Sequence, residues 1–414
     1  MSVVFGIIVG LFILMLLVTG HEFGHFIAAR KNGVEVEEFG IGFPPRAIAW
    51  RKVDGKWRRI KKTEWKKMPG EGLVLSLNWL PIGGFCQMKG ESDADTRKGS
   101  FGRANFWRKT KILFAGVAMN WLMAFIVLTV LAWIGMPHLL SNQFQIDEDT
   151  QLVVKRPVTI GEVKKGSPAD SVNLHEGDIV RQMRFVGCSE PGCEASDGER
   201  VQITTTGDLL AFNEKYAGQK VWMTYERNSD VMTAEIQLNG ADDEFILGAT
   251  IGDLIYYRNT WSAPVVGFMT TLQLTGETFK GIGELVWNLF SGVARQLNIF
   301  DSGARQSGAE AVQKAGDSVS GPVGIIGVLF PNMLSSGINT LLFLTAIISI
   351  SLACMNVLPI PALDGGRWLL ILIFKLRKKK LTKETEEKIV GRAFAALLII
   401  VAIVTVLDIV RLIQ

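Results

Sequence analysis

The sequence predicts a multi-pass α-helical membrane protein with about four transmembrane helices, a membrane-associated β-rich cytoplasmic region and one exported α+β domain. Hydrophobic residues make up 48% of its 414 residues, which is a high share for a soluble protein. Four apolar runs are each long enough to cross a bilayer as a helix. The net charge of +4 is small and does not indicate a nucleic-acid-binding protein.

The apolar runs divide the chain into segments. We expect transmembrane helices at 1–31, 111–135, 337–366 and 390–413, a basic cytoplasmic region at 32–110, an exported domain at 158–239, and amphipathic outer-surface helices with a linker at 255–335. A hairpin that dips into the bilayer is the alternative for the last segment. The first run has no basic leader and no small-residue cleavage site, so we expect it to be retained as a membrane helix.

The distribution of Lys and Arg predicts the orientation in the membrane. Basic residues are concentrated at 32–110 and in a short loop at 375–380. The positive-inside rule places both segments in the cytoplasm and therefore both termini outside. The first helix then reaches the cytoplasmic side at its C-terminal end.

Strand signals lie inside the basic region. Residues 35–50 partly alternate between apolar and polar, Asp54-Gly55 is typical of a hairpin turn, and 73–77 is a second strand candidate. Residues 80–85, Leu-Pro-Ile-Gly-Gly-Phe, suit an edge strand or loop near a substrate, because Pro and paired Gly exclude a helix. Edge strands can capture an extended peptide by strand addition.

The exported domain is predicted to be compact. A helix is expected near 207–216, and a strand pair at 221–227 and 232–238. An inserted loop near 185–200 contains Cys188 and Cys193, whose spacing can close a small disulfide loop in an exported domain. Two free thiols are the equally open alternative.

The first apolar run contains an HExxH motif, His21-Glu22-Phe23-Gly24-His25. On a helix, two His four residues apart share a face and can hold one zinc ion, while the Glu takes a proton from a water that the ion activates. The alternative is a pair of structural histidines. The location favours function, because ionisable groups inside a membrane helix are costly without partners.

A catalytic zinc site needs a third protein ligand, and Asp364 is the candidate. It follows the third apolar run on the same side of the membrane as the motif. Pro359 and Pro361 are expected to unwind the helix there, and Gly365 and Gly366 to allow a close backbone approach. A helix cap at the interface is the alternative role for Asp364.

HEFGH at 21–25 and NVLPIPALDGG at 356–366 together resemble the site-2 protease family of intramembrane metalloproteases, and in particular its bacterial RseP-like branch. Residues 39–43, 80–85 and 321–325 resemble further motifs of this branch. So do 115–120, although Val117 stands where Pro is expected. The unit at 158–238 resembles a PDZ domain. The resemblance covers nearly the whole chain.

The resemblance implies one Zn²⁺ per chain, held by His21, His25 and Asp364, with Glu22 as general base. It also implies that an unwound substrate helix is held by Asn356 and by Pro81, Ile82, Gly83, Gly84 and Phe85. The implied substrates are transmembrane helices of single-pass membrane proteins in a bacterial inner membrane, cut in regulated proteolysis such as anti-sigma factor or signal peptide cleavage. Membrane lipids surround the enzyme, and the PDZ domain binds an exported peptide or the trimmed end of a substrate.

The chain departs from this branch in three ways. It has one PDZ domain where two are common, its segment 50–72 is longer and more basic, and its loop with Cys188 and Cys193 is unusual. Two other functions are weighed against proteolysis. One is a non-proteolytic scaffold that binds exported peptides, and the other is a zinc transporter, since His and Asp in membrane helices can form transport sites.

Overall fold

The computed structural model describes residues 3–53, 55–60, 72–140, 142–155, 157–185, 199–227, 230–241, 243, 245–253, 255–296, 307, 316 and 321–413. The chain forms two compact units. Unit 1 comprises Met1–Ile134 and Trp261–Gln414, and unit 2 comprises Gly135–Thr260. Cys188 and Cys193, the predicted disulfide pair, lie outside the described residues.

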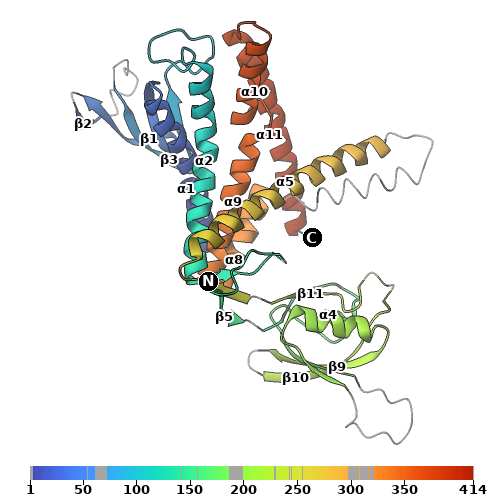
Figure 1. Ribbon diagram of the computed structural model, residues 1–414. Coiled ribbons are helices and arrows are strands. Elements are labelled where there is room, and N and C mark those ends of the chain that lie inside the picture. Colours follow the sequence, from blue (N-terminus) through green and yellow to red (C-terminus); the bar gives the residue numbers. More distant parts are fainter. Residues whose placement is uncertain are drawn as a thin grey trace, which may run out of the picture. The chain divides into compact units, whose positions relative to one another are not determined.

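Four helices of unit 1 are long and apolar enough to cross a membrane, as the sequence predicts. They are α1 (Val3–Lys31), α2 (Phe106–Ile134), α9 (Ile338–Val357) and α11 (Lys383–Ile413), the last as a span over Lys383–Val410. Each contains an apolar stretch of 18 residues with at most two charged side chains, and helical hydrogen bonding satisfies its backbone without water. The chain is therefore an integral membrane protein with several spans (Figure 1).

Helices α1 and α2 touch through their backbones. A Cβ atom at Gly24 of α1 would lie only 2.3 Å from the carbonyl oxygen of Ala115 of α2. Glycine at this position therefore permits an approach that any larger residue would prevent. Helix α2 also packs against α9 and against the long helix α5 (Ala263–Gln296).

The third span ends where the two prolines stand, as predicted. Helix α9 stops at Val357, and α10 (Asp364–Leu376) begins at Asp364. Added Cβ atoms at Gly365 and Gly366 would lie about 2 Å from the carbonyl oxygens of Val357 and Ile360. The prediction of a close backbone approach at these glycines is thus confirmed, and the approach fixes the first turn of α10 beside the end of α9.

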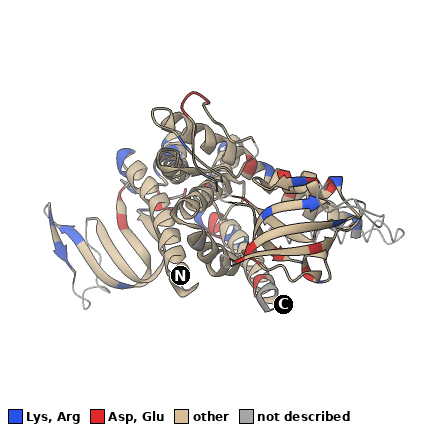
Figure 2. Cartoon of the chain, turned by 90° about the horizontal axis from the view of Figure 1, so that it is seen from below, with Lys and Arg blue, Asp and Glu red and all other residues tan. Residues whose placement is uncertain are grey.

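The region between α1 and α2 contains an antiparallel sheet in the order β2-β1-β3. Its strands are β1 (Val36–Val53), β2 (Lys56–Arg59) and β3 (Val74–Met88). The long strands pair with each other more than once, so that Phe39 lies opposite both Leu75 and Cys86. Both views show the sheet projecting sideways from the helices, and the second view shows Lys and Arg at its far end (Figures 1 and 2).

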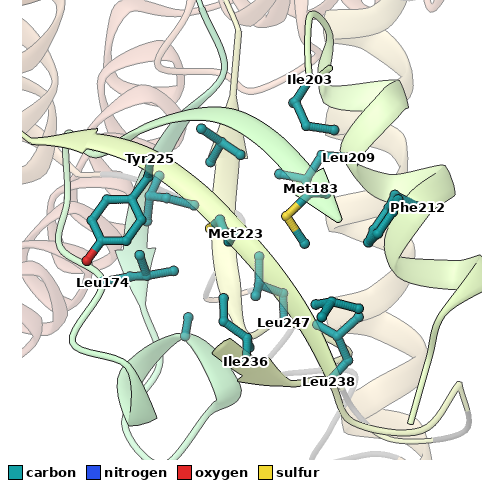
Figure 3. Close-up of a cluster of buried hydrophobic side chains, with 14 of the residues drawn as sticks. Leu174, Met183, Ile203, Leu209, Phe212, Met223, Tyr225, Ile236, Leu238 and Leu247 are labelled. Atoms are coloured by element: carbon teal, nitrogen blue, oxygen red, sulfur yellow. The ribbon is translucent and has the colours of Figure 1, made fainter. Parts of the chain in front are cut away.

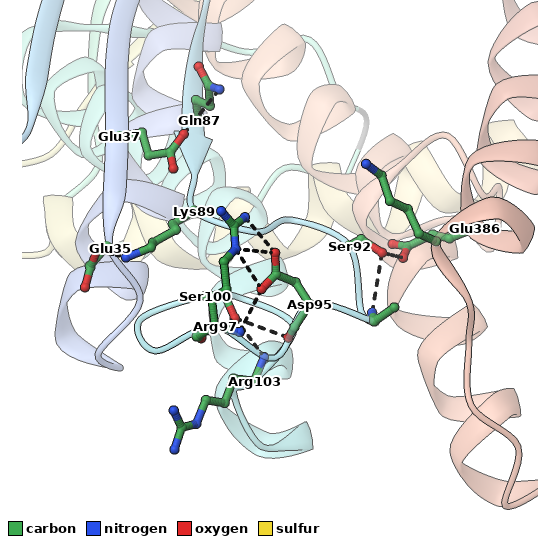
Figure 4. A network of polar contacts seen from close by, with 12 residues as sticks. Glu35, Glu37, Gln87, Lys89, Ser92, Asp95, Arg97, Ser100, Arg103 and Glu386 are labelled. Atoms are coloured by element: carbon green, nitrogen blue, oxygen red, sulfur yellow. Dashed lines mark hydrogen bonds and ion pairs between the residues drawn. The ribbon is translucent and has the colours of Figure 1, made fainter. Parts of the chain in front are cut away.

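The loop between β3 and α2 is tied to the C-terminal helices by polar contacts (Figure 4). The Glu386 carboxylate, buried at the start of α11, accepts hydrogen bonds from Ser92 Oγ at 3.1 Å and from the Asp93 backbone at 2.8 Å. Within the loop, hydrogen bonds from Arg97 lower the pKa of the Asp95 carboxyl to about 2. One carboxylate thus holds the loop against α11.

The segment predicted as outer-surface helices and linker also contributes to the helix packing. It contains α5, a short helical run formed by α7 (Pro322–Gly324) and the π-helix η2 (Ile325–Leu329), and α8 (Phe330–Ser336). Pro331 and Phe330 pack directly on Gly6 and Gly10 of α1. Asp408 of α11 accepts hydrogen bonds from the backbone of Gly321 at 3.2 Å and Gly324 at 2.8 Å, and so caps α7.

Unit 2 is an α+β unit with its own core. Its sheet has the order β10-β9-β7-β6-β11, with β8 paired to β7, and a small second sheet has the order β4-β12-β5. The strands and helices are β4 (Met136–Pro137), β5 (Gln151–Lys155), β6 (Thr159–Val163), α3 (Pro168–Ser171), β7 (Ile179–Phe185), β8 (Arg200–Gln202), α4 (Thr206–Lys215), β9 (Lys220–Arg227), β10 (Asp230–Gln237), β11 (Ala249–Gly252) and β12 (Ile255–Arg258).

The predicted helix and strand pair of unit 2 are present as α4 and β9–β10, and the sheet extends past the predicted boundary at 239 to include β11. Buried side chains such as Met183, Leu209 and Met223 fill the space between α4 and the sheet (Figure 3).

Unit 2 also contains an ion pair whose carboxylate is buried. Burial alone would raise the pKa of the Asp178 carboxyl group, but hydrogen bonds from Arg227 hold this pKa below its ordinary value.

Candidate metal centre

Two imidazoles of α1 and one carboxylate of α10 converge inside unit 1. His21 and His25 are one helical turn apart and both are buried. Their Nε2 atoms lie 3.1 Å apart, and Asp364 Oδ2 lies 3.1 Å from the first and 3.2 Å from the second. The structure therefore brings together the three residues that the sequence proposed as a ligand set.

The separations of the three donor atoms suit a small cation. Ligand atoms at about 2.0–2.1 Å from one tetrahedral zinc ion lie about 3.3 Å from one another. The observed triangle of 3.1–3.2 Å is only slightly smaller. Among the described residues, these three form the one group of His, Cys, Asp and Glu that is close enough to hold a metal ion.

The hydrogen bonds of the imidazoles also fit metal binding. His25 Nδ1 lies 2.8 Å from the Ile112 carbonyl oxygen, an acceptor, so the ring proton belongs on Nδ1 and the Nε2 lone pair faces the centre. The same tautomer at His21 would direct two lone pairs and a carboxylate oxygen at one point. Such an arrangement is repulsive until a cation occupies it.

Asn120 of α2 supplies a partner for His21. Its amide nitrogen lies 3.3 Å from His21 Nδ1, while its Oδ1 atom is buried and has no hydrogen-bond partner. The two amide atoms are exchanged by a half-turn of the side chain. In that orientation Asn120 Oδ1 accepts a hydrogen bond from the Nδ1–H group of His21, which leaves Nε2 available to a metal ion. The orphaned oxygen is thus explained by a metal-binding His21.

Gly116, one turn before Asn120 on α2, leaves room in front of the donors. An added Cβ atom would lie 2.5 Å from His25 Nε2 and 2.7 Å from His21 Nε2. In the sequence this glycine is notable only as part of the motif at 115–120. Its spacing of four from Asn120 places both residues on one face of α2 and is the signal that could have identified it.

Glu22 lies beside the centre and next to strand β3. Its carboxylate is close enough to His21, His25 and Asp364 to interact with their charges, and it lies near the backbone of Cys86. A carboxylate in this position can take a proton from a water held at the same centre. The geometry thus offers a base beside three metal donors.

Comparison with known proteins supports this interpretation of the site. The model of peptidase family M50 matches residues 9–401 of the chain. The chain belongs to peptidase family M50. This membership confirms two predictions made from the sequence, the resemblance to site-2 proteases and the enzyme class of a metalloprotease.

Several M50 relatives align over nearly their full length. A Clostridium perfringens protein, whose name includes zinc metalloprotease, is 27% identical over 394 residues and covers 95% of each chain. The zinc metalloprotease RasP of Shouchella clausii is 23% identical and covers 97% of each chain. The regulator of sigma-W protease RasP of Bacillus subtilis is 23% identical and covers 96% of each chain.

In this M50 peptidase, the predicted substrate strand at 81–85 lies against α1, about one helical turn before His21. An added Cβ at Gly83 would lie 3.1 Å from Val18 Cγ1, and one at Gly84 would lie 3.0 Å from Thr19 Oγ1. Pro81 is exposed, and Phe85 stacks on Phe43. The backbone of Ile82 is part of β3. Segment 81–85 therefore passes directly beside α1.

Asn356 lies in the last turn of α9. Its side-chain amide donates a hydrogen bond to the Leu352 carbonyl oxygen at 2.9 Å, and the side chain is partly exposed. It stands just before the break that precedes Asp364. The described contacts do not join Asn356 to the three donors.

Unit 2 contains a separate groove of about 340 Å³. Helix α4 forms one wall with Leu210, Asn213 and Glu214, and the edge strand β11 forms the other. Lys164, whose ammonium lies 4.8 Å from the ring centre of Phe245, also lines it. The sequence predicts a peptide-binding domain here, but its pattern does not identify the residues of the groove.

Proposed function

We propose that this M50 peptidase is an intramembrane zinc metalloprotease that hydrolyses peptide bonds within transmembrane segments of other membrane proteins. The observation that supports this most strongly is the triangle of donor atoms from His21, His25 and Asp364 with Glu22 beside it. The centre lies between helices that are apolar enough to cross a membrane. The names of the relatives described above agree with zinc as the metal.

The residues have distinct roles in this proposal. His21, His25 and Asp364 hold the ion, and Asn120 orients His21 by accepting a hydrogen bond from its Nδ1–H group. Zinc, when bound, supplies a Lewis acid that polarises a carbonyl group and makes water acidic near neutral pH. Glu22 takes a proton from the attacking water and gives it to the leaving amine. The backbone of Cys86 in β3 lies beside the Glu22 carboxylate.

A substrate helix must unwind before it can be cut, because its carbonyl groups are occupied by helical hydrogen bonds. We infer that residues 81–85 of β3 hold the unwound segment by strand pairing. Their position against Val18 and Thr19, one turn before His21, would bring a paired segment to the donors. Asn356, at the end of α9, would hold the same segment from the other side.

We further propose that unit 2 is a PDZ domain on the exported side of a bacterial inner membrane. The groove between α4 and the edge strand β11 suits an extended peptide, which would add to the open edge of the sheet. Its ligand would be an exported peptide or the trimmed end of a single-pass membrane protein. Regulated intramembrane proteolysis, for example of an anti-sigma factor or a signal peptide, is the process that these parts suit.

The test measures zinc content and cleavage together on the purified full chain in detergent, with a model transmembrane substrate. We expect about one zinc per chain in the wild type. Glu22→Gln should keep the zinc and lose about 10³-fold in cleavage rate, because it removes only the base. Asp364→Ala should lose both metal and activity.

Other outcomes would favour other functions. Zinc-free, inactive wild-type protein that still binds exported peptides would support a scaffold. Zinc uptake into vesicles without cleavage would support a transporter. Cleavage that persists in pure Glu22→Gln protein would contradict the role of Glu22 but not that of the metal.

A further inference from the structure

Among the described residues at the far end of the β2-β1-β3 sheet, 50–53 and 55–59, there are five cations and no carboxylate. We call residues 50–53 of β1 and 56–59 of β2 the basic hairpin. It contains Arg51, Lys52, Lys56, Arg58 and Arg59. No ion pair between described residues includes any of these five; the neighbouring cations that form ion pairs are Arg46, Lys89 and Arg97.

Two of these cations face each other across the strands. Arg51 lies directly opposite Arg58 in the antiparallel register. Like charges in this position destabilise a strand pair. An anion between the two guanidinium groups would turn the repulsion into attraction, and phosphate matches the planar donor fork of arginine.

Arg51 gives a second indication of a missing anion. Its Nε atom is buried and has no hydrogen-bond partner among the residues that the structure describes. The side chain lines a cavity of about 1300 Å³, and the described residues of its walls include six cations, Arg30, Arg46, Arg51, Lys52, Lys89 and Arg97, and three carboxylates, Glu35, Glu37 and Glu38. The Arg46, Lys89 and Glu38 side chains are already engaged in ion pairs. The cavity therefore presents an excess of positive charge and one unsatisfied donor.

The cavity lies at one end of a membrane span. Arg30, in the last turn of the span α1, lines the same cavity as Arg51. The sheet projects sideways from the helices, so it extends along the membrane rather than away from it (Figures 1 and 2). Trp50, Trp57 and Trp79 are 37%, 46% and 68% exposed, and tryptophan side chains with this exposure are typical of the headgroup layer.

We propose that the basic hairpin and its cavity bind the phosphate groups of anionic phospholipids in the leaflet at the Arg30 end of α1. Arg51 and Arg58 hold a phosphate between them, Lys52, Lys56 and Arg59 add to the attraction, and Trp50 and Trp57 insert at headgroup level. The exposed tryptophans and the position at the end of a span favour a lipid over an acidic peptide. This proposal depends on the membrane location of unit 1 and not on proteolysis.

The experiment uses the full chain in uncharged detergent micelles. Binding is measured as energy transfer from tryptophan to a dansyl-labelled phosphatidylglycerol, with dansyl-labelled phosphatidylcholine as the uncharged comparison. We expect saturable binding of phosphatidylglycerol that weakens about 25-fold in Arg51→Gln/Arg58→Gln, at about fivefold per removed charge. The matched control Lys379→Gln/Lys380→Gln removes two exposed charges from the turn after α10 and should bind as the wild type does.

Several results would overturn the proposal. Equal binding of the two lipids, or equal loss in the control variant, would show that the hairpin has no special role. Displacement of the lipid by glycerol phosphate at similar concentration would indicate a free anion as ligand, and displacement by an acidic peptide would indicate a peptide. If Arg51→Gln/Arg58→Gln elutes as aggregated protein, Lys56→Gln tests the same strand face at an exposed position, and wild-type affinity there would also contradict the proposal.

Discussion

Helices α1 and α11 have almost equal hydropathy, and yet they play different parts in the structure. Neighbouring segments pack closely against the glycines of helix α1, where Pro331, Phe330 and the backbone of Ala115 contact it. Helix α11 exposes most of its apolar side chains, including Leu398 and Ile399 at 51% and 61%. Hydropathy thus identifies a span, but the positions of small residues decide which span can carry a rigid site.

The few polar contacts of α11 are also of a different kind. Glu386, near its start, holds the loop after β3, and Asp408, near its end, holds the backbone of Gly321 and Gly324. The polar residues of α1 instead face one another and Asp364. Helix α11 is therefore fastened at its two ends, while α1 is fixed along its length.

Among the variants that test this comparison of helices, the largest effect is expected from a methyl group at the contact between α1 and α2. Gly24→Ala would place a Cβ atom 2.3 Å from the Ala115 carbonyl oxygen and force the helices apart. A displacement of about 1 Å in the donors would lower the cleavage rate about 100-fold. The matched control is Gly391→Ala in α11, where no atom lies within 4 Å of the new Cβ. Zinc content and cleavage are measured for both, and equal effects would refute the comparison.

A pair of leucines tests the same difference through stability. Leu17 of α1 is 1% exposed, whereas Leu398 of α11 is 51% exposed. Leu17→Ala should lower the free energy of unfolding by about 3 kcal/mol because it leaves a cavity. Leu398→Ala should change it by less than about 0.5 kcal/mol. Unfolding of both variants in mixed micelles with increasing denaturing detergent gives the values, and a larger loss for Leu398→Ala would contradict the packing described.

Asp408 tests whether α11 is fastened at its end. Asp408→Leu removes the acceptor for two backbone N–H groups and should cost about 2 kcal/mol in the same unfolding assay. Asp408→Asn keeps an acceptor oxygen and should cost less than half as much. Equal losses in the two variants would show that the negative charge, and not the hydrogen bonding, holds the helix.

The smallest effect concerns a carboxylate that caps a helix outside the membrane, as Asp408 caps α7 within unit 1. Hydrogen bonds from Thr204 and from the backbone of Thr205 lower the pKa of Asp208, in the first turn of α4, to about 2. An aspartate in an unfolded chain has a pKa of about 3.9. The stabilisation is therefore complete above about pH 4 and is lost as the pH falls from there toward 2.

A carbon-detected titration of fragment 135–260 and its unfolding as a function of pH measure this effect. Asp208→Asn should remove this part of the pH dependence. Asp230→Asn, at an exposed position in β10, should not alter it. A pKa near 4 for Asp208 in the folded fragment would contradict the capping geometry.

Much of the candidate site could be predicted from the sequence because its residues belong to short, recognisable motifs. HExxH places two donors on one helix face, and Asp364 follows a run whose prolines must end a helix. The roles of Gly116 and Asn120 could not be predicted, because they depend on how closely α2 approaches α1. That distance is a property of packing between segments far apart in the chain.

The fold shows the same division. The four spans could be predicted because apolar length alone determines them. The packing of α8 on α1 could not, since the segment before α9 has the composition of a surface linker and is fixed by Gly6 and Gly10 of a distant helix. The positions of 81–85 beside α1 and of the groove beside α4 also depend on tertiary contacts that no local pattern encodes.

The distance along the chain between the donors has a consequence for biosynthesis. Asp364 stands 343 positions after His21. A ribosome therefore delivers α1 to the membrane long before the third donor exists, and a prematurely terminated chain that ends before α10 has an incomplete centre. With the ligand set proposed above, the protease can become active only when its synthesis is nearly finished.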